Sequence, residues 1–222
     1  MSPEQMSPKH NYQKELEHRI EQFQKEDRLP RLLLHSCCAP CSSYVLEYLS
    51  EYFDITIFYY NPNITSRDEY LKRVAEVKRL IAGLPVKHPI SFIEGDYEPR
   101  EFTAAVKGLE NEPEGGARCA RCFELRLRKT AETAAGMARD TGEEILFTTT
   151  LTISPLKNAD LLNSIGEKAA TLYEGIFWLN SDFKKRDGYK RSIELSRQYG
   201  LYRQDYCGCV YSKRGSHKQD IP

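Results

Sequence analysis

The chain has 222 residues, which suits one large domain with a substantial core, and its 32 basic side chains balance its 32 acidic ones. A formal net charge of zero offers no support for a protein that binds nucleic acid or a membrane through its overall charge. The first residues are polar and no apolar run could span a bilayer, so we expect a cytoplasmic protein with no membrane or DNA partner.

The chain begins with the pattern of an amphipathic helix. Tyr12, Leu16, Ile20 and Phe23 recur at helical spacing, which predicts a helix over about residues 11–26 that packs on the domain.

Short apolar runs alternate with helical patterns along the rest of the chain. We expect strands at residues 32–35, 54–60, 90–94, 144–150 and 175–179. We expect helices from Pro40 onward and over residues 65–81, 98–107, 118–139, 156–172 and 189–199. This alternation predicts an α/β fold, a parallel sheet with helices on both faces.

Seven cysteines fall into three tight clusters. They are Cys37, Cys38 and Cys41, then Cys119 and Cys122, then Cys207 and Cys209. Thiolates this close in sequence bind soft metals or iron–sulfur clusters, or exchange electrons as a dithiol. The first cluster directly follows a strand, where parallel sheets bind ligands. Structural disulfides are rare in the cytosol, and an odd number of cysteines does not fit a fully paired scheme.

Structural zinc is the main alternative, because two Cys-x-x-Cys units often form a zinc ribbon. However, adjacent Cys37 and Cys38 are unusual around one tetrahedral ion, and seven thiols exceed its needs. The residues alone favour an iron–sulfur or mixed metal site, and they leave zinc and a thiol–disulfide enzyme open.

Six motifs occur in order along the chain. They are HSCCAPCSS at residues 35–43, YNPNI at 60–64, ARCARCF at 117–123, TTLTISP at 149–155, FKKRDGY at 183–189 and YCGC at 206–209. Together they resemble the non-cobalamin epoxyqueuosine reductase family, QueH, over about residues 11–212.

The resemblance implies that the epoxide of epoxyqueuosine, at the wobble position of a tRNA anticodon, is reduced to the alkene of queuosine, the final step of queuosine biosynthesis. It also implies a [4Fe–4S] cluster, an additional iron ion, an electron donor that the sequence does not identify, and a Rossmann-like fold similar to adenine-nucleotide alpha-hydrolases. The phosphate loop of that fold is absent, and residues 37–42 occupy the equivalent turn, which argues against an ATP-dependent tRNA-modifying enzyme. A zinc-stabilised RNA-binding protein without redox activity is the remaining alternative.

Given this resemblance, two cysteine pairs can supply the four thiolates that a [4Fe–4S] cluster needs. We expect the cluster at Cys37, Cys38, Cys119 and Cys122. The thiols left for the additional iron are Cys41, Cys207 and Cys209. Two alternatives stay open: Cys207 and Cys209 could form a redox pair, and Cys37 or Cys38 could bridge to the second metal.

Removing the epoxide oxygen takes two electrons and two protons and releases water, so a nearby acid is needed. The candidates are Asp182, Lys185, Asp187 and Tyr189. Residues 184–191 and 118–129 each carry five basic side chains against one acidic, so anticodon phosphates could bind there. Tyr60 or Tyr189 could stack on a splayed base.

We divide the chain into an N-terminal helical extension at residues 1–30, an α/β metal-binding catalytic domain at 31–212 and a polar tail at 213–222. His35 ends an apolar strand, so we expect a hydrogen-bonded core residue in preference to a metal ligand. Asn61 and Asn63 follow the second strand and could form a turn or face the site.

Overall fold

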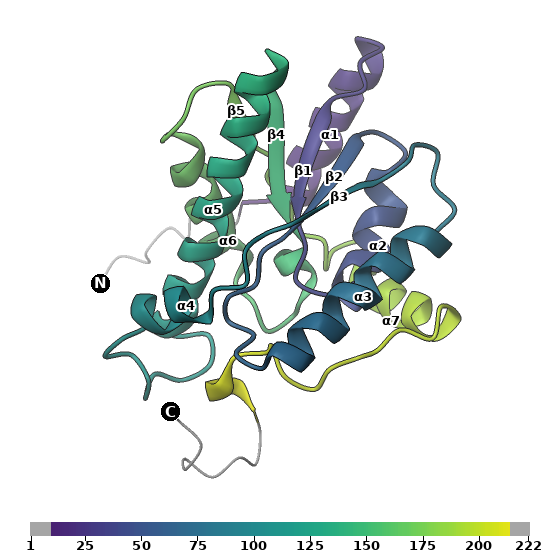
Figure 1. Ribbon diagram of the computed structural model, residues 1–222. Coiled ribbons are helices and arrows are strands. Elements are labelled where there is room, and N and C mark those ends of the chain that lie inside the picture. The colour runs from purple at the N-terminus through teal and green to yellow at the C-terminus, as the bar shows by residue number, and fades with distance from the viewer. Residues whose placement is uncertain (1–9, 214–222) are drawn as a thin grey trace, which may run out of the picture.

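Five parallel strands form one sheet in a computed structural model that describes residues 10–213 (Figure 1). The order across the sheet is β3-β2-β1-β4-β5. The strands are β1 Arg31–His35, β2 Asp54–Tyr59, β3 Ser91–Glu94, β4 Ile145–Thr149 and β5 Ile176–Trp178. The expected α/β class is therefore confirmed. The start of the N-terminal extension and the polar tail beyond Lys213 lie outside the described residues.

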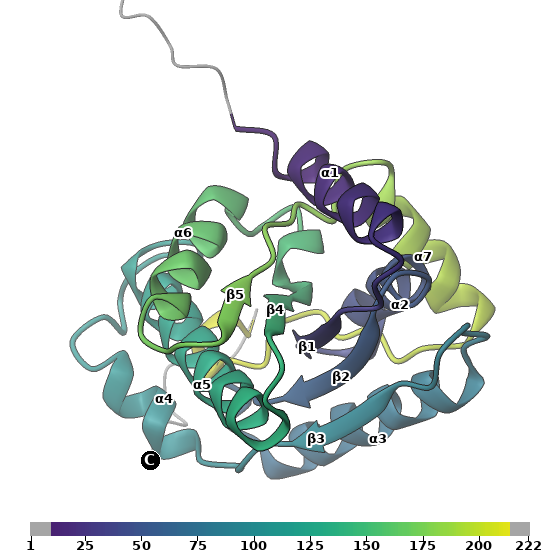
Figure 2. The same ribbon diagram turned by 90° about the horizontal axis from the view of Figure 1, so that it is seen from above.

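Helices cover both faces of this sheet (Figure 2). They are α1 Tyr12–Lys25, α2 Ala39–Leu49, α3 Arg67–Gly83, α4 Pro99–Ala105, α5 Ala117–Thr141, α6 Ala159–Ala170 and α7 Gly188–Gln198. On one face, α1, α2 and α3 share an apolar core with β1 and β2, and α7 packs on α2. On the other face, α5 and α6 pack against β4 and β5.

The alternation of side chains along β1 explains why the sheet is covered twice. Leu32 and Leu34 belong to the core beneath α1, α2 and α3, whereas Leu33 belongs to the core beneath α5. Successive residues of a strand point to opposite faces, so an uninterrupted apolar run needs cover on both. Helix α1 contributes Leu16 and Ile20 to the first core, as its apolar spacing predicts.

Strand β1 lies at the point where the chain changes direction across the sheet. It pairs with β2 on one side and with β4 on the other, so that His35 is opposite both Phe58 and Thr149. Ligands of open α/β sheets bind outside the carboxyl ends of the strands at such a reversal. The first cysteine cluster begins two residues after His35, at this position.

The segment after β4 differs from the expectation. The predicted strand at 144–150 ends at Thr149, and residues Thr150–Ile153 form a 3₁₀ turn, η1. The side chain of Thr149 accepts a hydrogen bond from the backbone N–H of Leu151, which favours the turn over a longer strand. Helix α6 starts only after Asn158, whose side chain caps it, and not at residue 156.

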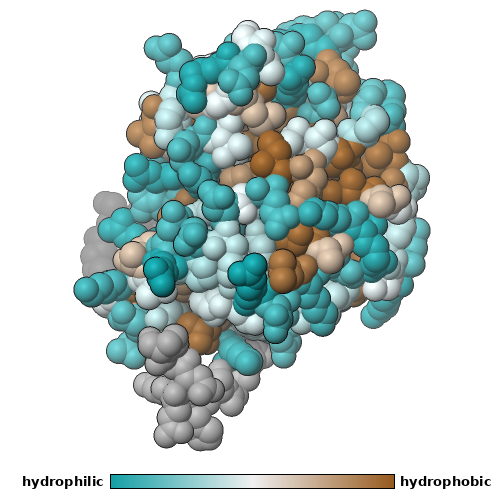
Figure 3. Space-filling view, viewed as in Figure 1, coloured by the Kyte–Doolittle hydropathy of each residue, from teal (hydrophilic) through white to brown (hydrophobic). Residues whose placement is uncertain are grey.

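Most of the surface seen in Figure 3 is hydrophilic, and apolar residues appear there as separate patches. Within residues 10–213, no helix is both long enough and apolar enough to cross a bilayer.

The close packing of α6 on β5 yields a stability prediction. A Cβ at Gly166 would lie 2.2 Å from a ring atom of Trp178, which also packs edge-on against Phe147. We expect Gly166→Ala to lower the free energy of unfolding by about 1–3 kcal/mol, because overpacking displaces the ring. The control is Gly136→Ala on α5, where the nearest atom is 3.9 Å away and alanine should stabilise the helix. Urea titrations in which both variants behave alike would contradict the prediction.

Candidate metal centre

The first cysteine cluster occupies the turn between β1 and α2. Cys38 is the N-cap residue of α2, and Pro40 in the first turn has the backbone angle that a helix start requires. This turn brings the sulfurs of Cys37, Cys38 and Cys41 within 4.8 Å of one another. Three converging thiols of this kind could hold a metal ion.

Hydrogen bonds give these three thiols unequal acidity. Those from Cys38 and Cys41 lower the pKa of Cys37 well below its ordinary value. The same bonds raise the pKa of Cys38 to about 12 and raise that of Cys41. The hydroxyl of Thr150 also donates to the Cys37 sulfur, at 3.4 Å. Cys37 is therefore the most acidic thiol of this cluster, and a metal that bound the other two would release their protons.

The second cluster lies on the first turns of α5, where Cys119 and Cys122 are one turn apart. The backbone N–H of Gly115 donates to the Cys119 sulfur at 3.2 Å. Cys122 is buried, and this burial raises its pKa to about 11. Gly115 adopts a positive φ of 87°, which lets the chain turn sharply into the helix.

The third cluster is held in place by contacts from elements far away in sequence. The buried guanidinium of Arg73 donates to the backbone carbonyls of Tyr206 and Cys207 at 3.3 and 3.2 Å. The side-chain amide of Asn63 donates to the Cys207 carbonyl at 3.1 Å. Glu69 fixes Arg73 through an ion pair of 2.6 Å. In Figure 1 this C-terminal segment accordingly runs back beside the start of α3.

Cys207 and Cys209 form a thiolate–thiol pair. Hydrogen bonds from Cys209 and from the Ser212 hydroxyl lower the pKa of Cys207 to about 5, and this interaction raises the pKa of Cys209. The pair therefore offers one anionic sulfur near neutral pH.

The three clusters meet around two adjoining cavities. One, of about 130 Å³, is lined by four of the sulfurs, from Cys119, Cys122, Cys207 and Cys209. The other, of about 190 Å³, is lined by Cys38, Cys41 and again Cys207. Cys37 lines neither cavity, but it packs with Cys119 against the apolar cluster that contains Phe123. Sequence segments some 170 residues apart thus contribute to one centre.

Two cations lie close to these sulfurs. Lys157, which the sequence analysis did not name, lines both cavities, and Arg126, one of the basic side chains of the stretch 118–129, lines the first. Burial alone would lower the pKa of Lys157, but the nearby thiols of Cys37 and Cys41 raise it. A set of seven sulfur donors with two inward-facing cations suits an anionic metal–thiolate group, so the residues fit the metal centre that the motifs imply.

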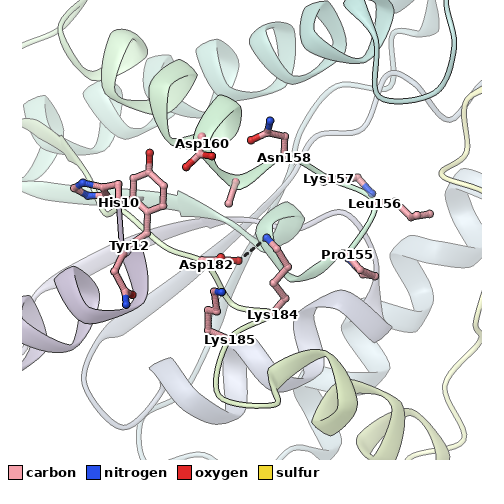
Figure 4. A pocket seen from close by; sticks show the side chains of 12 residues that line it. His10, Tyr12, Pro155, Leu156, Lys157, Asn158, Asp160, Asp182, Lys184 and Lys185 are labelled. Atoms are coloured by element: carbon pink, nitrogen blue, oxygen red, sulfur yellow. Dashed lines mark hydrogen bonds and ion pairs between the residues drawn. The ribbon is translucent and has the colours of Figure 1, made fainter. Parts of the chain in front are cut away.

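The four expected acids lie in different places. Tyr189 lines the cavity that contains Cys38 and Cys41. Asp182 and Lys185 line a separate, open cleft of about 620 Å³, where Asp182 pairs with Lys184 at 2.5 Å (Figure 4). Asp187 precedes α7 with a positive φ of 57° and lines neither the cavities nor the cleft.

The cleft and the metal cavities share the loop between η1 and α6. Figure 4 shows Leu156 and Lys157 on the side of the cleft away from His10 and Tyr12. Leu156 is 67% exposed although apolar, and it lines the cleft and both cavities. The loop therefore forms the wall between the cysteines and the cleft.

His35 is a buried, hydrogen-bonded core residue, as expected. Its Nδ1 lies 2.7 Å from the hydroxyl of Thr149, its partner across the sheet. Asn61 also faces inward, where its amide donates to the carbonyl of Ser36 at 2.9 Å.

One expectation about RNA contacts is wrong, and a second applies to fewer residues than expected. Tyr60 is 1% exposed and its hydroxyl donates to Glu101, so no base can stack on it. In the basic stretch at 118–129, Arg118 and Arg126 are buried, whereas Arg121 and Arg128 are exposed. Charge spacing along a helix does not reveal which side chains its neighbours will cover.

The comparisons with known proteins agree with the motifs. A family model described as epoxyqueuosine reductase QueH matches residues 32–215. A relative of that name from Streptococcus pyogenes is 42% identical over 216 residues, which are 96% of this chain and 81% of the relative. One from Staphylococcus epidermidis is 44% identical, over 91% of this chain and 84% of the relative. A third, from Thermotoga maritima, is 37% identical over 82% of this chain and 89% of the relative.

The close packing that positions the third cysteine cluster can be tested at Gly208. This residue has a φ of 101°, and a Cβ there would lie 2.6 Å from a side-chain carbon of Ile64. We expect Gly208→Ala to displace Cys207 and Cys209 and to reduce the iron bound per chain after anaerobic reconstitution. Gly108→Ala is the control, because φ is 83° there but no atom lies within 4 Å. Equal iron contents in the two variants would show that the loop tolerates the methyl group.

Proposed function

The chain belongs to the epoxyqueuosine reductase QueH family, and we propose that it reduces epoxyqueuosine in tRNA to queuosine. The observation that carries this proposal is the convergence of six of the seven cysteines on two adjoining cavities at the carboxyl end of β1, with Cys37 packed beside Cys119. The proposed partner is therefore a tRNA that carries epoxyqueuosine in its anticodon, and the proposed location is the cytoplasm.

We propose that the cysteines hold a [4Fe–4S] cluster and an additional iron ion. The residues assigned to the cluster are Cys37, Cys38, Cys119 and Cys122, and those left for the iron are Cys41, Cys207 and Cys209. When bound, the cluster would supply electrons one at a time and the iron would supply Lewis acidity. The two adjoining cavities support a division into two sites, and Cys207, which lines both cavities, lies between them.

The conversion of an epoxide to an alkene consumes two electrons and two protons and releases one water. Of the four candidate acids, Tyr189 is the one we propose as proton donor, because it lines the cavity of Cys38 and Cys41 and is 38% exposed to incoming substrate. Asp182 is held in an ion pair with Lys184. We assign Asp182 and Lys185 to the neighbouring cleft, where Lys185 would contact an RNA phosphate.

A zinc-stabilised RNA-binding protein is the second candidate. The three sulfurs of Cys37, Cys38 and Cys41 lie close enough to bind zinc as well as iron. Zinc proteins are colourless and do not transfer electrons, whereas an iron–sulfur protein absorbs visible light and can be reduced.

The decisive experiment is an anaerobic assay of the iron-reconstituted protein with tRNA containing epoxyqueuosine and a chemical reductant. Nucleoside mass spectrometry should detect the loss of one oxygen atom and the formation of queuosine. A preparation that holds zinc but no iron and leaves the tRNA unchanged would favour the second candidate.

The cysteine pair on α5 yields the next prediction. Cys119→Ala and Cys122→Ala should each abolish cluster assembly, because each removes one of four ligands. Iron and sulfide analysis measures the loss, and circular dichroism checks that the fold persists. Thr133→Ala, further along the same helix, is the control and should load fully. A full complement of iron and sulfide in either cysteine variant would refute the assignment.

The proton donor can be tested by removing a single hydroxyl. Tyr189→Phe should lower kcat by about 10²-fold or more, the usual contribution of a general acid, with little change in KM. Tyr173→Phe makes the same chemical change at another exposed site and serves as control. An unchanged kcat in Tyr189→Phe would return the role to the other candidates.

A further inference from the structure

Arg126 is a buried cation whose partners in the protein are all neutral. It lies on α5, one turn after Cys122, and is 3% exposed. Across residues 10–213, its hydrogen bonds go to His35 and Asn61, and no carboxylate forms an ion pair with it. A buried charge without an opposite charge is costly, so a guanidinium at this depth needs an anion.

His35 cannot neutralise Arg126, because an imidazole carries either no charge or a positive charge. The Nε of Arg126 lies 3.3 Å from Nε2 of His35, and the same Nε2 lies 3.2 Å from the carbonyl oxygen of Tyr60. On the other side of the ring, Nδ1 lies 2.7 Å from the hydroxyl of Thr149, which the pairing of β1 with β4 places opposite His35.

Asn61 completes the support from the neighbouring strand. Its amide oxygen accepts a hydrogen bond from Arg126, while its amide nitrogen donates to the Ser36 carbonyl at 2.9 Å. The two bonds determine which end of the amide faces the guanidinium. The side chains of His35 and Asn61 therefore orient Arg126 without cancelling its charge.

The anions within reach of this charge are the thiolates. Arg126 lines the cavity of Cys119 and Cys122. Two of the five N–H groups of the guanidinium bond to His35 and Asn61, so the others can serve acceptors in the cavity.

We propose that Arg126 is the counter-ion of the thiolate-bound iron–sulfur group and that His35 and Asn61 are positioning residues that hold it there. This inference rests on the proposed function. Reduction adds one negative charge to the group, and a fixed cation in a buried site stabilises that charge. Arg126 therefore raises the reduction potential, so that a weaker electron donor can reduce the group.

The test measures the midpoint potential of the reconstituted protein by a redox titration followed with electron paramagnetic resonance. Arg126→Gln should shift the reduction equilibrium at least tenfold toward the oxidised form. This shift corresponds to a midpoint potential lower by about 59 mV for a one-electron couple. Arg126→Lys should retain most of the parent potential. Arg128→Gln makes the same change of charge at an exposed position two residues along α5 and should have no effect.

A second variant separates charge from structural support. Asn61→Asp keeps Arg126 in place but gives it a carboxylate partner that cancels its charge. We expect a lower potential, as in Arg126→Gln, although Arg126 is still present. An unchanged potential in this variant would overturn the proposal, because a carboxylate that cancels the charge of a counter-ion must lower the potential.

The remaining outcomes are equally decisive. If Arg126→Gln binds no cluster while Arg126→Lys loads fully and both melt at the parent temperature, the requirement for charge is supported. If neither loads although both are folded, the proposal is overturned, because lysine supplies the same charge. A loaded parent with an unshifted Arg126→Gln overturns this inference alone, whereas a parent that binds no cluster overturns the proposed function with it.

Discussion

The structure depends on gathering sulfur atoms that carry negative charge into a poorly solvated interior. Hydrogen bonds from neighbouring thiols lower the pKa of both Cys37 and Cys207, which favours the thiolate form at these two positions. Mutual repulsion would drive such groups apart unless cations or metals opposed it. Arg126 and Lys157 lie close enough to the sulfurs to oppose this repulsion, and the surrounding residues keep these two cations in position.

The sheet supplies the rigid part of this arrangement. Strand β1 ends between β2 and β4, and the three strands deliver His35, Asn61 and Thr149 to one buried network. This network lies directly behind the first cysteine turn. A site carried by paired strands keeps its geometry better than one carried by loops, which suits a centre whose electrostatics depend on the orientation of Arg126.

The C-terminal segment contributes two cysteines that no strand or long helix holds in place. Cys207 and Cys209 lie in a loop, and their position depends on the buried Arg73 with its partner Glu69. In many nucleotide-binding proteins with an open α/β sheet, the turn after the first strand holds a phosphate. Here the same turn offers thiols, and the C-terminal loop closes over it, so the ligand site of the fold is kept while its chemistry is changed.

The sequence by itself determined the order of strands and helices, the three cysteine clusters and the burial of His35. These features depend on local periodicity and on spacing within one turn, both of which are written in neighbouring residues. Proximity to the metal site was only partly predictable: Tyr189 lines a cysteine cavity, whereas Asp182 and Lys185 line the next cleft.

Only the tertiary structure decided which charged side chains face inward. Arg73 and Arg126 look like ordinary surface residues of charged helices, and the stretch at 118–129 resembled a phosphate patch. Whether such a side chain is exposed depends on the elements that pack over its helix, and those come from distant parts of the chain. The convergence of Cys207 with Cys38 and Cys41 has the same origin, because no local pattern records the contacts that fold the C-terminal loop back to β1.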